Sequence, residues 1–329
     1  MITVIKPYCC NLFWIFLIQL FFGIPAISSA QLTDTTGTST GMKGAPRAYR
    51  PDTRSVAMGE ATVADVTVSS SMNLNPASLS LTYQRNTVHL NLIQDWRTDI
   101  VTAGLTTPII RFGTHSAIMQ LTLHQSLDDP PVQIGNPLPL RPRITVVQID
   151  LAYSINLKNT VSFGILNSSS LAKSRDGQYL TNYSSIGVIY APSRSLSYGL
   201  VLRGLGRSTT YEILDTGQTI LGSQVLRTSL ELGATLHYPV EADHHFLSIS
   251  FSNEKIFQER GIWYKTGAEW HIVKYLALRS GLIIHPEDRL FIPRLGTGLR
   301  LGQLSLDYSV SPRNRIHEHF HQFSISYHN

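Results

Sequence analysis

Three histidines close together near the end of the sequence are the first candidate for metal chemistry. They lie in the tract His317-Glu318-His319-Phe320-His321, and residues two apart in an extended strand point to the same side. Imidazole is a common zinc ligand, but no second strand offers obvious partner ligands. The pair His244-His245 at a predicted turn has the same weakness. A solvated histidine cluster is the alternative, and we expect no metal site.

Motifs for nucleophilic catalysis and for phosphate binding are also poorly supported. The serine-rich stretch Asn167-Ser168-Ser169-Ser170 lacks the G-x-S-x-G context of a nucleophile elbow. The glycine-rich pieces Arg203-Gly204-Leu205-Gly206 and Gly296-Thr297-Gly298 precede no predicted helix, so relief of crowding in curved strands explains them better than phosphate binding. We expect no catalytic residue, no cofactor and no enzyme activity; an outer-membrane lipid hydrolase, with Ser and His at a barrel rim, is a remote alternative.

The first 30 residues have the order of a secretory signal peptide. Lys6 precedes an apolar run over residues 12–22, a glycine and a proline break the helix, and small residues end at Ala30. The apolar run is shorter than the roughly 20 residues that a spanning helix needs. The sequence therefore predicts export and cleavage after Ala30.

Both cysteines of the sequence, Cys9 and Cys10, lie before this apolar run and would leave with the signal peptide. We therefore expect the mature protein to have no cysteine, which excludes a disulfide framework, a thiolate metal site and a cysteine nucleophile. The formal net charge of +5 is mild and the basic residues form no stripe, so nucleic acid is not an expected partner.

From about Thr87 onward the sequence alternates between apolar and polar residues. In the run Val147–Leu157 every odd-numbered residue is apolar, while the residues between them are polar or small. The same rule applies to residues 226–238, 247–252, 304–310 and 322–327. Because successive side chains of a strand face opposite sides, each run has one continuously apolar face.

The alternating runs approach the roughly 9–11 residues that a tilted strand needs to cross a bilayer, and no later segment is long and apolar enough to cross as a helix. We count about 14 strands, an even number that suits a closed single-chain barrel. The sequence predicts an all-β fold, a transmembrane antiparallel barrel. The alternative is a soluble sandwich with one wet face, which also alternates.

Charged residues are confined to the polar face of these runs. On the lipid face at mid-depth an arginine would cost about 2–4 kcal/mol, so this confinement favours a membrane barrel. The side chains that we expect to face the lumen are Asp150, Arg227, Glu231, Lys265, Glu269, Arg300 and Asp307.

The segment between the predicted signal peptide and the first strand resembles the N-terminal signature of the PorV/PorQ family and its FadL-like relatives. The resemblance lies in residues 54–65, RSVAMGEATVAD, and in residues 73–79, NLNPASL, with further similarity in the closing strands. It implies a FadL-like barrel with a small N-terminal hatch, whose motif residues are Asn75, Pro76, Ala77 and Gly59. Independently of the family, Pro76 disfavours helical geometry at Asn75, and Asn75 can cap a short helical turn.

These observations divide the chain into a signal peptide (1–30), a flexible N-terminus with the hatch (31–82) and an outer-membrane barrel (83–329). The resemblance implies a role in protein secretion or cargo attachment in the type IX secretion system, with secretion components or secreted cargo as partners. The alternative is a passive channel for hydrophobic small molecules, as in FadL relatives, with outer-membrane lipid around the barrel in both cases.

Overall fold

The computed structural model describes residues 52–67, 72–82, 87–95, 100–107, 109–126, 145–173, 177–213, 219–238, 247–312 and 319–328. The predicted signal peptide and the residues around His317 lie outside these ranges. No helix in the described part of the chain is long and apolar enough to span a membrane.

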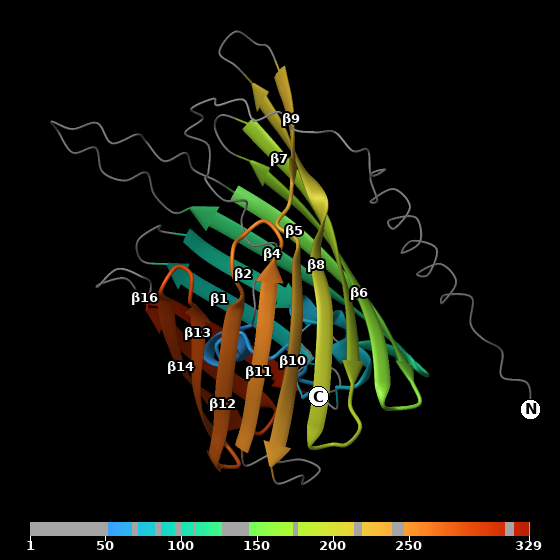
Figure 1. Cartoon of the computed structure of the whole chain (residues 1–329), viewed down its shortest axis with the longest axis vertical. Coiled ribbons are helices and arrows are strands. Elements are labelled where there is room, and N and C mark those ends of the chain that lie inside the picture. Colours follow the sequence, from blue (N-terminus) through green and yellow to red (C-terminus); the bar gives the residue numbers. More distant parts are fainter. Residues whose placement is uncertain are drawn as a thin grey trace, which may run out of the picture. The chain divides into compact units, whose positions relative to one another are not determined.

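The strands form one antiparallel sheet that closes on itself. The order β10 to β16, then β1, β2 and β4 to β8, returns to its start because β8 also pairs with β10. The closed ring contains 14 strands, which confirms the predicted barrel (Figure 1). The strands are β1 (Thr87–Asp95), β2 (Ile100–Thr106), β3 (Ile110–Phe112), β4 (His115–Ser126), β5 (Thr145–Leu157), β6 (Val161–Lys173), β7 (Gly177–Tyr190), β8 (Leu196–Ile213), β9 (Thr219–Val225), β10 (Ser229–Tyr238), β11 (Leu247–Ile256), β12 (Trp263–Val273), β13 (Leu276–His285), β14 (Leu290–Leu301), β15 (Leu304–Pro312) and β16 (His319–His328).

The barrel has its polar residues inside and its apolar residues outside. Along β10, Glu231, Thr235 and His237 are buried, whereas Leu232 is 57% exposed and Tyr238 is 68% exposed. This is the reverse of a soluble sandwich, which would bury the leucines against a second sheet. The alternation in the sequence therefore indicates a barrel with an apolar outer surface and a polar interior.

The two ends of the barrel differ in their connections. At the end where β1 begins and β16 ends, which we call the termini end, turns such as Lys274-Tyr275 and Gly302-Gln303 join strands directly. At the opposite end, the loop end, the connection between β4 and β5 runs from residue 127 to residue 144. Short turns at one end and longer loops at the other are typical of outer-membrane barrels.

The wall is interrupted at two places. β2 and β3 both pair with β4, so they are two pieces of one strand, and between them Thr107 makes its backbone hydrogen bond to Met119 at 2.8 Å. β9 and β10 likewise both pair with β8, with Leu226 and Arg227 in the gap. Opposite this second gap β8 has a bulge at Gly204, whose φ of 76° a residue with a side chain rarely adopts.

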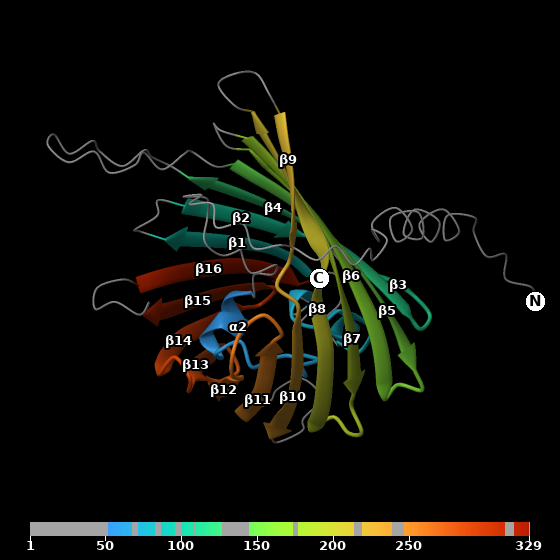
Figure 2. The same ribbon diagram turned by 45° about the horizontal axis from the view of Figure 1, so that its top comes forward.

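Residues 52–67 and 72–82 lie inside the ring of strands and include two short helices, and we call these two pieces together the hatch (Figure 2). Asp52 caps α2 (Thr53–Ala57) by accepting a hydrogen bond from the amide of Ser55. Asn75 caps the 3-10 helix η2 (Pro76–Ser80) by accepting one from the amide of Ala77. α2 contacts β13 to β16, and η2 contacts β4 to β7, so the hatch reaches both sides of the barrel.

Candidate functional site: the hatch and the lumen

A ring of glycines lets the hatch approach the wall at backbone distance. A Cβ added at Gly267 would lie 2.2 Å from the backbone of Met58, and one at Gly199 would lie 2.4 Å from Val63. Seven wall glycines on seven different strands leave no room for a Cβ beside the hatch: Gly164, Gly199, Gly267 and Gly281 meet its backbone, and Gly187, Gly233 and Gly296 meet its side chains. Six of them form three directly opposed pairs across neighbouring strands, namely Gly164–Gly187, Gly199–Gly233 and Gly267–Gly281.

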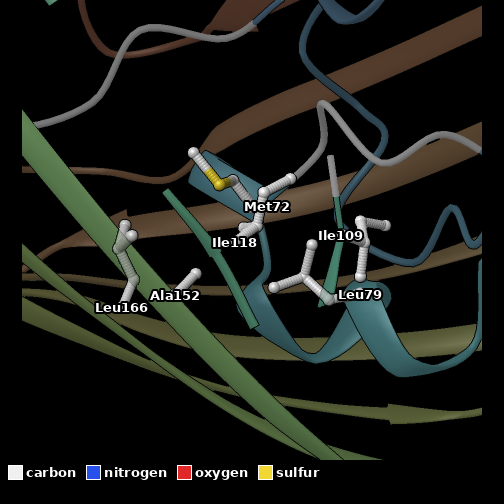
Figure 3. Close-up of a cluster of buried hydrophobic side chains, with 6 residues drawn as sticks. All are labelled: Met72, Leu79, Ile109, Ile118, Ala152 and Leu166. Atoms are coloured by element: carbon white, nitrogen blue, oxygen red, sulfur yellow. The ribbon is translucent and has the colours of Figure 1, made fainter. Parts of the chain in front are cut away.

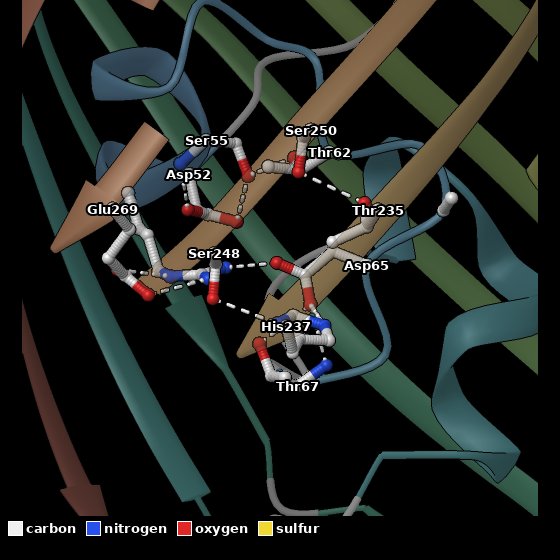
Figure 4. Close-up of polar contacts among 12 residues, drawn as sticks. Asp52, Ser55, Thr62, Asp65, Thr67, Thr235, His237, Ser248, Ser250 and Glu269 are labelled. Atoms are coloured by element: carbon white, nitrogen blue, oxygen red, sulfur yellow. Dashed lines mark hydrogen bonds and ion pairs between the residues drawn. The ribbon is translucent and has the colours of Figure 1, made fainter. Parts of the chain in front are cut away.

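Buried ion pairs hold the first half of the hatch, residues 52–67, against the wall. The guanidinium of Arg54 donates to both carboxylate oxygens of Glu269 on β12, at 2.8 and 2.9 Å, and to Asp65 at 2.6 Å. Arg279 on β13 bridges the same Glu269 to Asp307 on β15. Figure 4 shows Asp65 and Glu269 of this group with the nearby His237, which hydrogen-bonds Ser248. Apart from Asp307, whose side chain is 15% exposed, these charged side chains are at most 8% exposed.

Each charge of the hatch is stabilised by its partner rather than by water. Burial alone would lower the pKa of Arg54, but the neighbouring Asp65 and Glu269 raise it well above its ordinary value. Burial would raise the pKa of Asp65, but Arg54 and His237 together hold it below the usual range. Both groups are therefore charged at neutral pH, and each depends on the other.

A second buried cluster lies on the wall and reaches the hatch through a carbonyl. Arg203 on β8 donates to the carbonyl oxygen of Leu74 at 2.6 Å and forms ion pairs with Glu231 and Glu254. Lys265 on β12 also pairs with both glutamates. A separate pair joins Arg294 on β14 to Glu60 of the hatch at 2.9 Å.

The Asn-Pro-Ala motif fastens the second half of the hatch. The amide nitrogen of Asn75 donates to the carbonyl of Val63 at 2.9 Å, which ties the two halves of the hatch together. Ser162 on β6 donates to the carbonyl of Ala77 at 2.6 Å, and Gly164 leaves room for the backbone of Pro76. Gly59 of the same signature has a φ of 64° and faces the backbone of Leu282, which leaves no room for a side chain.

An apolar cluster fills the space between the hatch and the first wall interruption (Figure 3). Met72 and Leu79 come from the hatch, and Ile109 comes from the gap between β2 and β3. The cluster is completed by wall side chains that point inward, Ile118, Ala152 and Leu166. Side chains without polar groups therefore cover the gap from inside.

A second apolar patch faces inward nearer the loop end, on the other side of the ring. It consists of Ile256, Trp263 and Ile283, with Leu290 and Ile292 packed against them. Trp263 stacks on His285 with ring centroids 4.4 Å apart. The lumen thus combines buried polar rows with apolar clusters, among which is a further one where Val66 and Ala77 of the hatch pack against Ile189.

The residues predicted to face the lumen divide into two groups. Asp150, Glu231, Lys265 and Glu269 are buried on the inner face, and Asp307 faces Arg279 there. Arg227 differs from the expectation: it lies in the gap after β9, where its side chain is 42% exposed and pairs with Glu259. Arg300 is exposed near the termini end of β14. The interruption at residues 226–228 shifts the side-chain alternation, so Leu226 is buried instead of Arg227.

Sequence reasoning missed three residues that complete the site. Arg54 and Arg279 anchor the hatch network, and Arg203 anchors the second cluster. Arg54 could have been noticed as a basic residue within a segment of mostly small residues. For Arg203 and Arg279, nothing in the sequence pairs them with carboxylates on other strands.

No protein-family model matches the chain, and no curated protein matches it in sequence. Solved structures do match it in fold. The toluene transporter TbuX of Ralstonia pickettii superposes with a TM-score of 0.61 at 12% identity, covering 84% of this chain and 98% of that one. The toluene transporter TodX of Pseudomonas putida gives 0.59 at 13% identity, with 85% and 97% covered. A FadL homologue of Pseudomonas aeruginosa gives 0.53 at 12% identity, with 84% and 98% covered. The fold is therefore a FadL-like barrel.

Proposed function

We propose that this protein is an outer-membrane channel for small hydrophobic molecules. The observation that carries the proposal is a barrel with a lipid-compatible exterior whose interior is crossed by a hatch and by two apolar patches. The fold likeness to proteins described as toluene transporters adds support.

The exterior fits a bilayer of ordinary thickness. On β5 the outward apolar residues run from Val147 to Leu157, close to the length that a tilted strand needs to cross. Exposed aromatic side chains gather near the termini end, where interfacial tyrosine and tryptophan are expected: Tyr190, Tyr198, Tyr238, Trp270 and Tyr275. The proposed location is the outer membrane, with the termini end toward the periplasm.

The hatch and the wall interruption define the proposed route. Because residues 52–67 and 72–82 of the hatch are packed against the wall, a molecule entering from the loop end meets them before it can travel the length of the barrel. The apolar cluster of Met72, Leu79 and Ile109 leads instead to the gap between β2 and β3. A hydrophobic molecule would leave the lumen there, through the wall, without crossing the buried charges.

The test is uptake by cells of a two-membrane bacterium that lacks channels of its own for toluene. Cells producing the protein should take up radiolabelled toluene faster than cells with an empty vector, and Ile109→Asp should remove most of the gain. Thr266→Asp introduces the same side chain on the outer face of β12. The amount of folded barrel is measured for both variants, so that a general folding defect can be told from a loss of transport. Equal uptake with and without the protein would overturn the proposal.

The secretion role implied by the Asn-Pro-Ala motif is the second candidate. It rests on the resemblance of residues 54–79 to PorV/PorQ proteins, and the fold likeness favours the channel. Co-purification separates the two: secretion components or cargo recovered with the barrel would favour secretion, and their absence together with toluene uptake would favour the channel.

A further inference from the structure

One buried carboxyl group of the lumen has no lysine or arginine beside it among the residues that the structure describes. Asp150 on β5 is 1% exposed and points inward, and its carboxylate oxygens accept hydrogen bonds at 2.9 and 3.1 Å from the side-chain amide of Gln148. No lysine or arginine in the described part of the chain forms an ion pair with it. A buried carboxylate is normally paired, so this position stands out.

Asp150 lies at the edge of the hatch that faces the loop end. The next inward residue on β5, Ala152, belongs to the apolar cluster that touches the hatch. The residue opposite Asp150 on β4, Gln120, accepts a hydrogen bond from Asn73 of the hatch at 3.0 Å. The amide of Gln148 also donates to the hydroxyl of Tyr183 at 3.3 Å. A molecule that follows the proposed route passes this row just before it reaches the apolar cluster.

The other buried charges around the hatch do not leave a free cation to attract anions. The five cations of the ion-paired clusters, Arg54, Arg203, Lys265, Arg279 and Arg294, each contact at least one carboxylate. Arg111 also points inward, but it donates to the carbonyl of Thr82 where the hatch meets the termini end. Among the described residues, the route therefore presents one carboxyl group without a cationic partner, whereas the buried cations around the hatch contact carboxylates or, for Arg111, a carbonyl group.

We propose that Asp150 sets the charge selectivity of this channel. It binds the ammonium group of small apolar amines, with Gln148 moving aside and the hydroxyl of Tyr183 accepting a second hydrogen bond, and it repels carboxylate-bearing molecules of the same size. The apolar body of the ligand then lies against Ala152 and Leu166 of the same wall. This inference rests on the proposed channel function and adds the substrate class.

Equilibrium dialysis of the purified protein in neutral detergent at pH 7 tests it, with a matched series of radiolabelled benzylammonium, benzyl alcohol and benzoate. The wild type should bind benzylammonium at least tenfold more tightly than benzoate, with benzyl alcohol between them. Asp150→Asn should bring the ratio of the two charged ligands close to one while benzyl alcohol binding is unchanged. Asp288→Asn, which removes an exposed carboxylate at the loop end, should leave the ratio unchanged.

The outcomes separate the two proposals. If benzyl alcohol binds but benzylammonium has no advantage over benzoate, the role of Asp150 is overturned and the channel stands. If none of the three ligands binds, the channel itself is in doubt. Should Asp150→Asn fail to fold, Gln148→Ala serves instead: it uncovers the carboxylate, so benzylammonium binding should strengthen, and a weakening would overturn the proposal.

Discussion

The two sides of the hatch are held to the wall by different forces. Residues 52–67 meet β12 to β15 through buried ion pairs, centred on Arg54 and Glu269. Residues 72–82 meet β4 to β7 through apolar side chains and through hydrogen bonds to carbonyl groups. Moving the first side would separate buried ion pairs, whereas moving the second would break apolar contacts and single hydrogen bonds such as that of Ser162 to the Ala77 carbonyl. If the barrel opens, it should therefore open at the apolar side, where the wall is already interrupted.

The largest expected effect comes from removing the cation of the charged side. Arg54→Met leaves Asp65 and Glu269 buried without Arg54, and breaking a buried pair in this way destabilises by about 3–5 kcal/mol. Arg227→Met removes a half-exposed pair with Glu259 and should change stability by less than about 1 kcal/mol. Both are measured by urea unfolding of the purified barrel. Equal effects of the two substitutions would contradict the importance of buried ion pairs for the charged side of the hatch.

A smaller loss of stability, but a gain in transport, is expected on the apolar side. Leu79→Ala truncates a fully buried side chain of the cluster beside the wall gap, which costs about 2–4 kcal/mol. Because the side chain covers the gap from inside, toluene uptake per folded barrel should rise. Leu236→Ala removes a leucine from the outer face and should leave uptake unchanged. Unchanged uptake in Leu79→Ala would place the route elsewhere.

The glycine ring offers a third way to separate the hatch from the wall. Gly267→Val places atoms within about 2 Å of the Met58 backbone, so the hatch must shift, and overpacking of this kind costs about 1–3 kcal/mol. Ion conductance across a planar bilayer should increase as the hatch loosens. Thr266→Leu adds bulk on the outer face of the same strand and should conduct like the wild type. A closed Gly267→Val barrel would show that the hatch can shift without leaving a path.

The sequence predicted the repeating part of the fold much better than its exceptions. Alternation of the kind seen in Val147–Leu157 gave the strands, their inner and outer faces and the closed barrel, because a bilayer imposes the same requirement on each strand. The same reasoning misplaced Arg227, because a gap of three residues without sheet pairing changes which face the next side chain meets. A gap in the pairing also depends on the neighbouring strand. The gap at residues 226–228 lies opposite the bulge at Gly204 on β8.

The site could be predicted from the sequence only where the sequence contains a recognisable motif. Asn75 and Pro76 identified the hatch, and the structure explains them through a cap and a carbonyl contact. The pairing of Arg54 with Glu269 joins residues 215 positions apart, and no local pattern records it. Of the glycines expected to relieve crowding in curved strands, Gly296 makes room for Ala57 of the hatch, whereas Gly204 and Gly206 lie against the backbone of neighbouring chain segments.

The smallest expected effect concerns pH and isolates one carboxylate of the charged side. Because the pKa of Asp65 is lowered in the folded protein, its contribution to stability is present above the pKa of the unfolded chain, about 3.9, and is lost as the pH falls through the folded value. Asp65→Asn keeps the shape but not the charge, so wild type and variant should differ by about 1–3 kcal/mol at pH 7 and converge below about pH 4. The measurement is guanidinium unfolding at pH 7, 5, 4 and 3. A difference that stays constant over this range would mean that the hydrogen bonds to Thr67, rather than the charge opposite Arg54, account for the role of Asp65.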